Sequence, residues 1–185
     1  MSPHPPHHEV LIAGFGGQGI VLAGRLLAIA AVGEGREVVW APSYGPEMRG
    51  GAVHCTVIIS SARIGSPEVS LADSLLIMDN ASLPRFSHRV KPGGLFILNS
   101  SLVRGDPEQD QCQVIRVPAN EVAEELGEPR AANVVMLGSF LQARPVVSLA
   151  SLEAAIRRVG GDREALIAVN LEALARGVEL GRLTG

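Results

Sequence analysis

Three glycines after a short apolar run have the spacing of a phosphate-binding turn. Gly14, Gly16 and Gly19 in "GFGGQG" match the pattern G-x-G-x-x-G, and the sequence between them adds Gly17 and the amide side chain of Gln18. Glycines at these positions permit a tight turn and let a phosphate approach the backbone, while a following helix offers free N–H groups and positive potential. The pattern therefore indicates phosphate binding. A glycine turn that serves only close packing or subunit docking stays open as the alternative.

A second stretch, "PSYGPEMRGG" at 42–51, has the composition of a shaped loop. Prolines stiffen it, and glycines permit sharp turns. Its candidates for contact with a ligand or a partner are Ser43, Tyr44, Glu47, Met48, Arg49, Gly50 and Gly51. Arg49 is the strongest candidate for a functional charge, because a guanidinium forms paired hydrogen bonds with phosphate or carboxylate. The alternative is a surface ion pair between Glu47 and Arg49.

The elements that must position both stretches follow from the apolar runs. Short runs of β-branched and aliphatic residues predict strands, and longer periodic runs that end on glycine predict helices. Strands are expected at 9–13, 37–41, 52–60, 74–79, 93–101 and 112–118, and helices at 20–33, 119–127 and 132–142 and in two amphipathic segments, the first capped by Ser148. Strand, glycine turn, helix and strand over residues 9–41 form a βαβ unit, which implies parallel strands.

This order of elements predicts a single α/β domain with an open, mostly parallel, Rossmann-like sheet and helices on both faces. Both candidate stretches follow a strand of that sheet. We therefore expect both at its carboxyl edge, where such folds meet ligands and partners. Residues 1–8, "MSPHPPHH", are expected to form a disordered lead-in, and residues 9–185 the domain.

Composition excludes several classes of function. The 185 residues carry a net charge of −3 without a basic stripe, which argues against nucleic-acid binding. No apolar stretch approaches the ~20 residues that span a bilayer. The N-terminal residues lack the layout of a signal peptide. We expect a cytoplasmic protein that contacts neither nucleic acid nor membrane.

The thiols and imidazoles predict no metal site. Cys55 and Cys112 lie far apart in the sequence, so the thiols of this chain alone cannot build an iron–sulfur cluster or a zinc site. Cys55 lies in an apolar run and is expected to be a buried small hydrophobe. The histidines His4, His7 and His8 have metal-binding side chains, but a disordered tail is the preferred interpretation.

Classical NAD(P) binding is disfavoured by the end of the second predicted strand. A dinucleotide site needs an acidic residue there, about 20 residues after the glycine turn, to bind the ribose hydroxyls. The strand instead ends on "WAPS", and Glu37 lies at its beginning. A stand-alone NAD(P)-binding Rossmann oxidoreductase stays as an alternative function.

Three segments together resemble the gamma subunit of 2-oxoacid:ferredoxin oxidoreductases. They are "GFGGQGIVLAGRLLAIAA", "PSYGPEMRGGAVHCTVIIS" with the following "IGSPEV", and "PRAANVVMLGSF". The resemblance extends from about residue 9 to about residue 180. It is strongest to the branch that uses 2-oxoglutarate and 2-oxoisovalerate, and related domains occur in pyruvate:ferredoxin and indolepyruvate oxidoreductases. "PSYGPEMRGG" is much more specific than a lone G-x-G-x-x-G.

The resemblance implies a role within a larger enzyme. That family oxidatively decarboxylates a 2-oxoacid on thiamine diphosphate, passes electrons through iron–sulfur clusters to ferredoxin, and releases an acyl-CoA. Thiamine diphosphate, magnesium and the clusters would lie in alpha, beta and delta (ferredoxin-like) partner subunits, with CoA as co-substrate. This chain would itself hold no cofactor, metal or catalytic residue.

The resemblance also implies how the two stretches would act. They would dock on the thiamine-bearing subunits and help shape the acyl-CoA end of the active site. Alone, the chain is expected to be folded but inactive, and to self-associate or expose an apolar patch. A purely architectural subunit is the remaining alternative.

Overall fold

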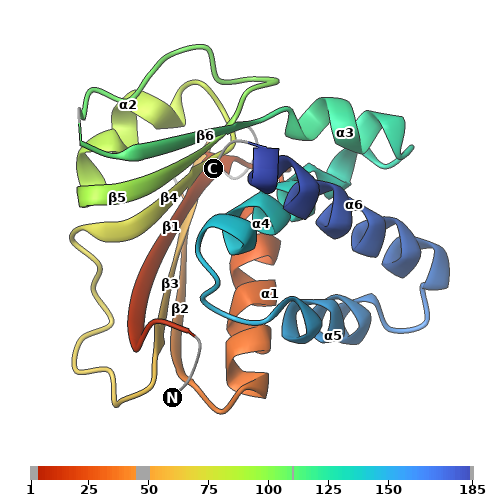
Figure 1. Ribbon diagram of the computed structural model, residues 1–185, viewed down its shortest axis with the longest axis horizontal. Helices are drawn as coiled ribbons and strands as arrows, with labels where there is room; N and C mark the ends of the chain where they lie inside the picture. The colour runs from red at the N-terminus through yellow and green to blue at the C-terminus, as the bar shows by residue number, and fades with distance from the viewer. Residues whose placement is uncertain (1–3, 45–50, 110, 184–185) are drawn as a thin grey trace.

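The computed structural model describes residues 4–44, 51–109 and 111–183 as one α/β unit (Figure 1). The elements follow one another as β1 His7–Phe15, α1 Ile20–Gly33, β2 Glu37–Tyr44, β3 Ala52–Ser60, β4 Ala72–Ile77, α2 Ser82–Phe86, η1 Ser87–Arg89, β5 Val90–Asn99, β6 Gln113–Val117, α3 Ala119–Glu125, η2 Pro129–Ala131, α4 Ala132–Ala143, α5 Leu149–Gly160 and α6 Glu164–Leu183. All the predicted strands and helices are present in the predicted order. The predicted bounds of α1 and β3 agree with the structure.

The sheet is mostly parallel, as predicted, but its strand order differs from the simple βαβ expectation. The six strands lie in the order β2-β3-β1-β4-β5-β6. β1, β4, β5 and β6 are parallel neighbours, whereas β3 pairs antiparallel with both β1 and β2. β1 and β2 therefore run in the same direction with β3 inserted between them. Their carboxyl ends lie at one edge of the sheet, which we call the carboxyl edge.

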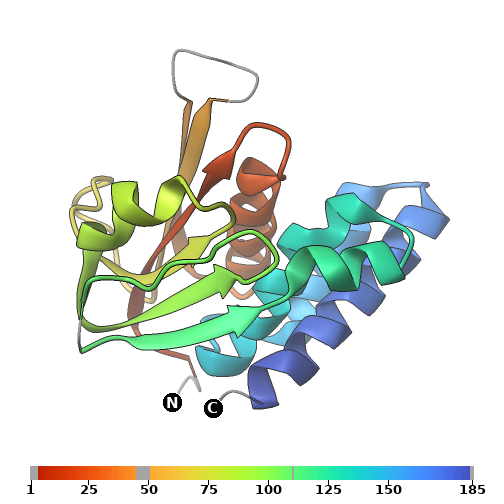
Figure 2. The ribbon, with the colours of Figure 1, turned by 90° about the horizontal axis from the view of Figure 1, so that it is seen from above.

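Helices cover the two faces unequally (Figure 1). The helices α1, α3, α4, α5 and α6 lie on one side of the sheet, and the short α2 with η1 lies on the other (Figure 2). This agrees with the prediction of helices on both faces, although loops supply much of the cover on the α2 side. Among the residues that the structure describes, none of the helices has both the length and the apolar character that a bilayer crossing requires.

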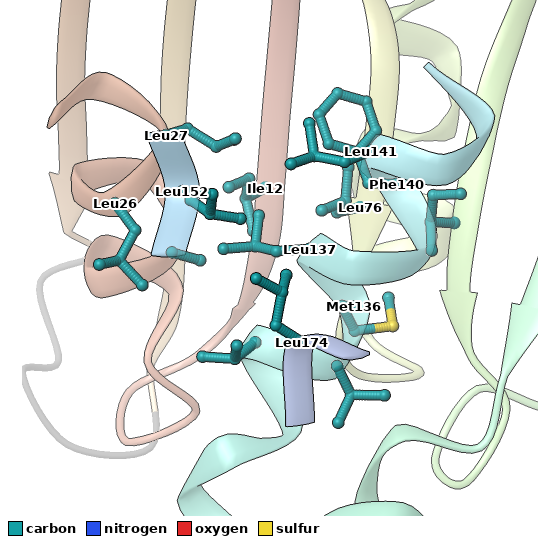
Figure 3. Packing of buried hydrophobic residues seen from close by; sticks show 14 of the residues in the cluster. Ile12, Leu26, Leu27, Leu76, Met136, Leu137, Phe140, Leu141, Leu152 and Leu174 are labelled. Atoms are coloured by element: carbon teal, nitrogen blue, oxygen red, sulfur yellow. The ribbon is translucent and has the colours of Figure 1, made fainter. Parts of the chain in front are cut away.

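Both faces of the central strands are buried, which explains their continuous apolar sequences. Along β5, Leu95 and Ile97 belong to the core beneath the large helices, while Phe96 and Leu98 belong to the core beneath α2. The larger core is made mainly of aliphatic side chains around α4, and Figure 3 shows Phe140 of that helix among its leucines. Successive side chains of a strand point to opposite faces, so each central strand stabilises two cores.

Helix α4 is buried along almost its whole length, because the sheet covers one side and α6 covers the other. The two helices approach closely through glycines. A Cβ added to Gly177 would collide with the backbone carbonyl group of Val135 and lie 3.1 Å from Cα of Gly138. The Ser139 hydroxyl donates a 2.7 Å hydrogen bond to the Gly177 carbonyl oxygen at the same contact. Small residues thus set the distance between these helices.

Strand β1 begins before the predicted boundary at Glu9. His7 and His8 pair with Ser60 and Ile59 of β3, so these two residues belong to the sheet and not to a disordered lead-in. His8 is buried, with its Nε2 atom 3.0 Å from the Ser74 hydroxyl oxygen. The prediction was wrong at these positions because polar residue types locally resemble a tail, while their cross-strand partners come from a distant segment.

Acidification should destabilise the protein through His8. Burial lowers the pKa of this imidazole from 6.5 to about 4, partly offset by the nearby Asp73 carboxylate. The unfolded chain therefore binds a proton between these two pH values that the folded chain does not. The free energy of unfolding should fall as the pH drops from 6.5 towards 4, by up to about 1.4 kcal/mol per pH unit. Urea unfolding at several pH values measures this slope.

The matched variant is His8→Gln, which is neutral at every pH. Its stability should fall less steeply than that of the wild type between pH 6.5 and 5, and the remaining slope comes from His54, whose pKa is also lowered by burial. Asp73 contributes at lower pH: burial alone would raise its pKa, but hydrogen bonds from the Lys91 ammonium and the Glu9 N–H lower it. An identical pH dependence in the wild type and the variant would contradict the assignment to His8.

Candidate functional site

The glycine turn follows β1 at the carboxyl edge, next to the point where the connections after β1 and after β4 lead to opposite ends of the sheet. From β1 the chain passes through α1 to β2 on one side, whereas from β4 it continues to β5 and β6 on the other. β1 and β4 are neighbours, so the turn after β1 and the residues after β4 border this switch point. Open α/β sheets bind ligands in the crevice outside such a point. The predicted position of the glycine turn at this edge is therefore confirmed.

The glycines of the turn differ in what they do. Gly17 and Gly19 have positive φ values of 108° and 75°, which side chains rarely adopt. Gly14 leaves no room for a side chain, because a Cβ there would lie 2.8 Å from Cδ1 of Ile20 and 2.9 Å from Cβ of Met78. Gly14 thus allows close packing of strand, turn and helix. Gly17 has open space around its α-carbon and presents bare backbone.

Gln18 stabilises the turn through hydrogen bonds at both ends of its carboxamide, one to the end of β1 and one to the residue after β4. Its Oε1 accepts a 2.9 Å hydrogen bond from the Phe15 N–H, and its Nε2 donates a 3.0 Å bond to the carbonyl oxygen of Met78 after β4. The Gln18 N–H also donates to the Phe15 carbonyl oxygen at 3.2 Å. Gln18 therefore holds the turn in place. Both polar atoms of its side chain form hydrogen bonds within the protein.

Buried asparagines complete the support of the turn. Asn133 of α4 donates through Nδ2 to the Gly19 carbonyl oxygen at 2.9 Å. Asn99, the last residue of β5, donates through Nδ2 to the carbonyl oxygen of Met78 at 3.1 Å and to Oδ1 of Asn120 at 2.7 Å. The Oδ1 atoms of Asn99 and Asn133 are buried and have no hydrogen-bond partner among the residues that the structure describes. Buried acceptors usually have a partner. The polar layer formed by Gln18, Asn99, Asn120 and Asn133 can therefore still accept hydrogen bonds from a water or from a donor group of a ligand.

A cleft of about 300 Å³ opens on this polar layer. Its lining comes from the glycine turn, the segments after β4 and β5, and the beginnings of α3 and α4: Phe15, Gly17, Gln18, Met78, Leu102, Asn120, Pro129, Arg130 and Ala132. Helices α1 and α4 both begin beside it, so the positive ends of two helices border one opening. Ahead of α4, the N–H groups of Arg130 and Ala131 already donate to the side chain and the carbonyl oxygen of Glu128.

The chemistry of the cleft suits an anion. Arg130 is the one charged side chain among the described residues that line it. This side chain is exposed, and its guanidinium makes no hydrogen bond or ion pair within the part of the chain that the structure describes. A guanidinium beside helix N-termini and bare glycine backbone is a favourable environment for phosphate or carboxylate.

The titratable side chains on β3 next to this edge offer no nucleophile. Burial raises the pKa of the Cys55 thiol to about 12, so this thiol stays protonated, and its predicted burial is confirmed. His54 faces α2, with its ring 5.0 Å from that of Phe86, and burial together with Arg89 and Arg85 lowers its pKa. Within the described residues, no three His, Cys, Asp or Glu side chains come together as metal ligands.

The second predicted stretch meets the glycine turn through its two flanks. Ser43 and Tyr44 are the last residues of β2 and not part of the loop, because β2 continues to pair with β3 as far as Tyr44. At the other flank, Gly51 is buried, and its carbonyl oxygen accepts a 3.1 Å hydrogen bond from the Gly16 N–H. The predicted proximity of the two stretches is confirmed for these flanks. The remaining candidates, Glu47, Met48, Arg49 and Gly50, lie outside the described residues.

The strand order gives a further reason against a classical dinucleotide site. In such a site the second strand is the direct neighbour of the first, so its terminal acid lies close to the glycine turn. Here β3 separates them, which places the end of β2 about 10 Å from β1 at the usual strand spacing. Tyr44, not an acid, ends β2.

The family comparison agrees with the resemblance drawn from the sequence. A model of the family described as "Pyruvate ferredoxin/flavodoxin oxidoreductase" matches residues 9–180. The chain belongs to this family. The matched range contains the glycine turn, the second stretch and the helices that border the cleft.

The chain is similar to subunits of several oxidoreductases. Subunit VorA of the ketoisovalerate oxidoreductase from Methanothermobacter marburgensis is 41% identical over 94% of this chain, which spans only 36% of the length of VorA. Subunit KorC of the 2-oxoglutarate synthase from Methanocaldococcus jannaschii is 39% identical over 80% of this chain and 81% of KorC. The gamma subunit of a keto/oxoacid ferredoxin oxidoreductase from Geobacter sulfurreducens has the same fold, with a TM-score of 0.83 and 32% identity over 95% of this chain and 99% of that one.

Sequence reasoning missed Asn120 and Arg130, which line the cleft. It also missed Asn99 and Asn133, whose side chains hydrogen-bond to Met78 and Gly19 beside it. Arg130 and Asn133 lie in "PRAANVVMLGSF", a segment that carried the family resemblance without receiving a role. An asparagine that ends an apolar strand, as Asn99 does, was a usable signal for the carboxyl edge. Asn120 gave none, because its position in α3 shows no contact with Asn99 until the chain is folded.

Proposed function

We propose that this chain is the gamma subunit of a multi-subunit 2-oxoacid:ferredoxin oxidoreductase. The enzyme would oxidatively decarboxylate a 2-oxoacid in the cytoplasm, form an acyl-CoA and pass the electrons to ferredoxin. The observation that carries the proposal is the match over 99% of the Geobacter gamma subunit, together with the match over 81% of KorC. The shared region is thus nearly a whole subunit of such enzymes.

Within that enzyme the chain would supply binding and positioning, not the redox chemistry. Thiamine diphosphate, magnesium and iron–sulfur clusters would be held by alpha, beta and delta partner subunits. The cleft at the carboxyl edge would receive an anionic group of the substrates, with Arg130 and the helix N-termini as the binding groups. The CoA phosphates and the 2-oxoacid carboxylate are such groups. Arg49 and the rest of the second stretch would contact the partner subunits beside this cleft.

The isolated chain should be folded but inactive. Its extensive aliphatic core supports an independent fold, while the proposal places the redox cofactors in the other subunits. The test is reduction of a viologen dye with a 2-oxoacid, CoA and thiamine diphosphate. The pure chain should give no rate above background, and co-expression with the partner subunits of its own source should yield an active complex that contains it.

Two results would contradict this proposal. Dye reduction by the isolated chain would mean that the chain itself holds the redox chemistry. Failure of the partner subunits to bind the chain, while they form an active enzyme without it, would exclude a gamma-subunit role. Fluorescence titration with NADH is a useful further control, since micromolar binding would restore the NAD(P) alternative.

A further inference from the structure

The outer face of α1 carries an exposed stripe with the spacing of a helix-packing seam. Leu22, Arg25, Ile29 and Val32 follow one another at intervals of three, four and three residues, which places them on one side of the helix. The inner side of α1 is already used, because its buried residues pack against the sheet and α5. Leu22 and Val32 are 38% and 58% exposed, whereas Ile29 between them is partly buried against the larger core.

Two hollows flank this stripe. One of about 410 Å³ is lined by α1, the edge strand β2 and the end of α5, and includes Trp40 and Arg158. The other, of about 160 Å³, lies between α1, α5 and α6 and reaches Leu22. Val159 lines both hollows, so they are neighbours on this side of the molecule. We call the stripe with these two hollows the α1 groove.

Trp40 forms a firm wall of the α1 groove. Its ring lies against Gly24, where an added Cβ would be 3.1 Å from Nε1. The ring is nevertheless 36% exposed. A rigid, partly exposed aromatic side chain beside an apolar stripe is typical of the central contacts of protein interfaces.

The charges of the α1 groove specify the character of its occupant. Arg25 and Arg158 are exposed, and neither guanidinium makes a hydrogen bond or ion pair within the described part of the chain. No acidic side chain is among the described residues that line the two hollows. An occupant that covers the groove must therefore bring carboxylates as well as apolar side chains.

The same charges argue against a second copy of this chain. In a two-fold symmetric contact each patch meets itself, so Arg25 and Arg158 would face the cations of the other copy. A strand added to β2 is also poorly supported. Pro42 lies in that edge strand and lacks the N–H that an added strand would need. The spacing of the stripe instead matches a helix.

We propose that the α1 groove is the docking site for an α-helix of a partner subunit, with an apolar stripe and carboxylates that pair with Arg25 and Arg158. Val32 lies ten residues after Leu22, or ~15 Å along the helix, which corresponds to about three turns of the occupant. The inference rests on the proposed subunit role and adds the surface and the chemistry of the contact. In VorA, only about a third of the length corresponds to this chain, so a related domain there adjoins much further protein.

The first test uses the co-expressed oxidoreductase complex with a photo-crosslinking amino acid at Val32. The expected product is a link to a helix of another subunit that carries Asp or Glu within one turn of the linked residue. The same probe at Leu71, which is 42% exposed at the start of β4 and outside the α1 groove, is the control and should not give that link. A link from position 32 to another copy of this chain, or no link in an active complex, would overturn the proposal.

The second test reverses the two charges. Arg25→Glu/Arg158→Glu should weaken assembly at least about tenfold, because two attractions become repulsions. The melting temperature of the isolated chain should change by only a few degrees, since neither side chain has a partner within the described residues and Arg158 adds only the favourable charge of the last turn of α5. Arg25→Lys/Arg158→Lys should assemble nearly as the wild type does. Binding would be measured by titrating the chain into the remaining subunits at low ionic strength.

The matched control is Arg63→Glu/Arg182→Glu, which makes the same change in net charge with two exposed arginines outside the α1 groove. It should assemble within about twofold of the wild type. Equal weakening by both double variants, or none by the first, would overturn the docking proposal and leave the subunit role intact. Failure of the wild-type chain itself to assemble would reject the proposed function and this inference together.

Discussion

Replacing Gly177 by alanine is expected to destabilise the protein by about 3 kcal/mol or more, although alanine is the better helix former. The added methyl group would meet the backbone of Val135 and Gly138, which cannot rotate away as a side chain can. Helices α4 and α6 would have to separate, which disturbs the Ser139 hydrogen bond and the buried surface of α4. Overpacking of this kind typically outweighs the ~1 kcal/mol that alanine gains over glycine in a helix. Thermal unfolding should show a decrease in Tm of roughly 6–12 °C.

Gly33→Ala is the matched control for that substitution. Gly33 ends α1 with a negative φ value, and an added Cβ there would have no atom within 4 Å. The variant should be as stable as the wild type or slightly more stable. A Gly177→Ala protein that melts at the wild-type temperature would show that α4 and α6 can move apart without loss. The close glycine contact would then not be needed for stability.

Arg130→Glu should raise the KM for an anionic substrate of the assembled enzyme about ten- to a hundredfold. Arg130 is the one charged side chain among the described residues of the cleft, and hydrogen bonds to charged groups contribute roughly 1.5–3 kcal/mol. The reversed charge would repel the CoA phosphates or the 2-oxoacid carboxylate. The value of kcat should change much less, because the reacting atoms lie with the partner subunits. Steady-state kinetics with CoA and the 2-oxoacid varied separately would show which of the two uses the cleft.

Two comparisons make the Arg130 result specific. Arg130→Lys keeps the charge and should lose only the paired hydrogen bonds, so its KM should lie between those of the wild type and Arg130→Glu. The isolated Arg130→Glu chain should melt as the wild type does, since the guanidinium has no partner within the described residues. Unchanged KM values for both substrates in a fully assembled complex would reject the cleft as an anion site.

The strands, the longer helices and the edge of the sheet at which the candidate site lies could all be predicted from local sequence patterns. Apolar periodicity and glycine stops are local properties of the chain, so they predicted α1 over residues 20–33 and β3 over residues 52–60 as the structure has them. The glycine turn could be placed because a turn between a strand and a helix must lie at the end of that strand. Family membership likewise followed from contiguous segments, and the match over residues 9–180 confirmed it.

The order of the strands in the sheet and the contacts between distant segments became known only from the tertiary structure. The insertion of β3 between β1 and β2 could not be predicted, because parallel and antiparallel neighbours are chosen by packing between segments distant in the sequence. The burial of His8 has the same cause, since its partners come from β3 and β4. The cleft unites Gln18 with Asn120 and Arg130, more than 100 residues further along the chain. Residues so far apart show no mutual spacing in the sequence, so their meeting at one edge depends on the order in which the strands assemble.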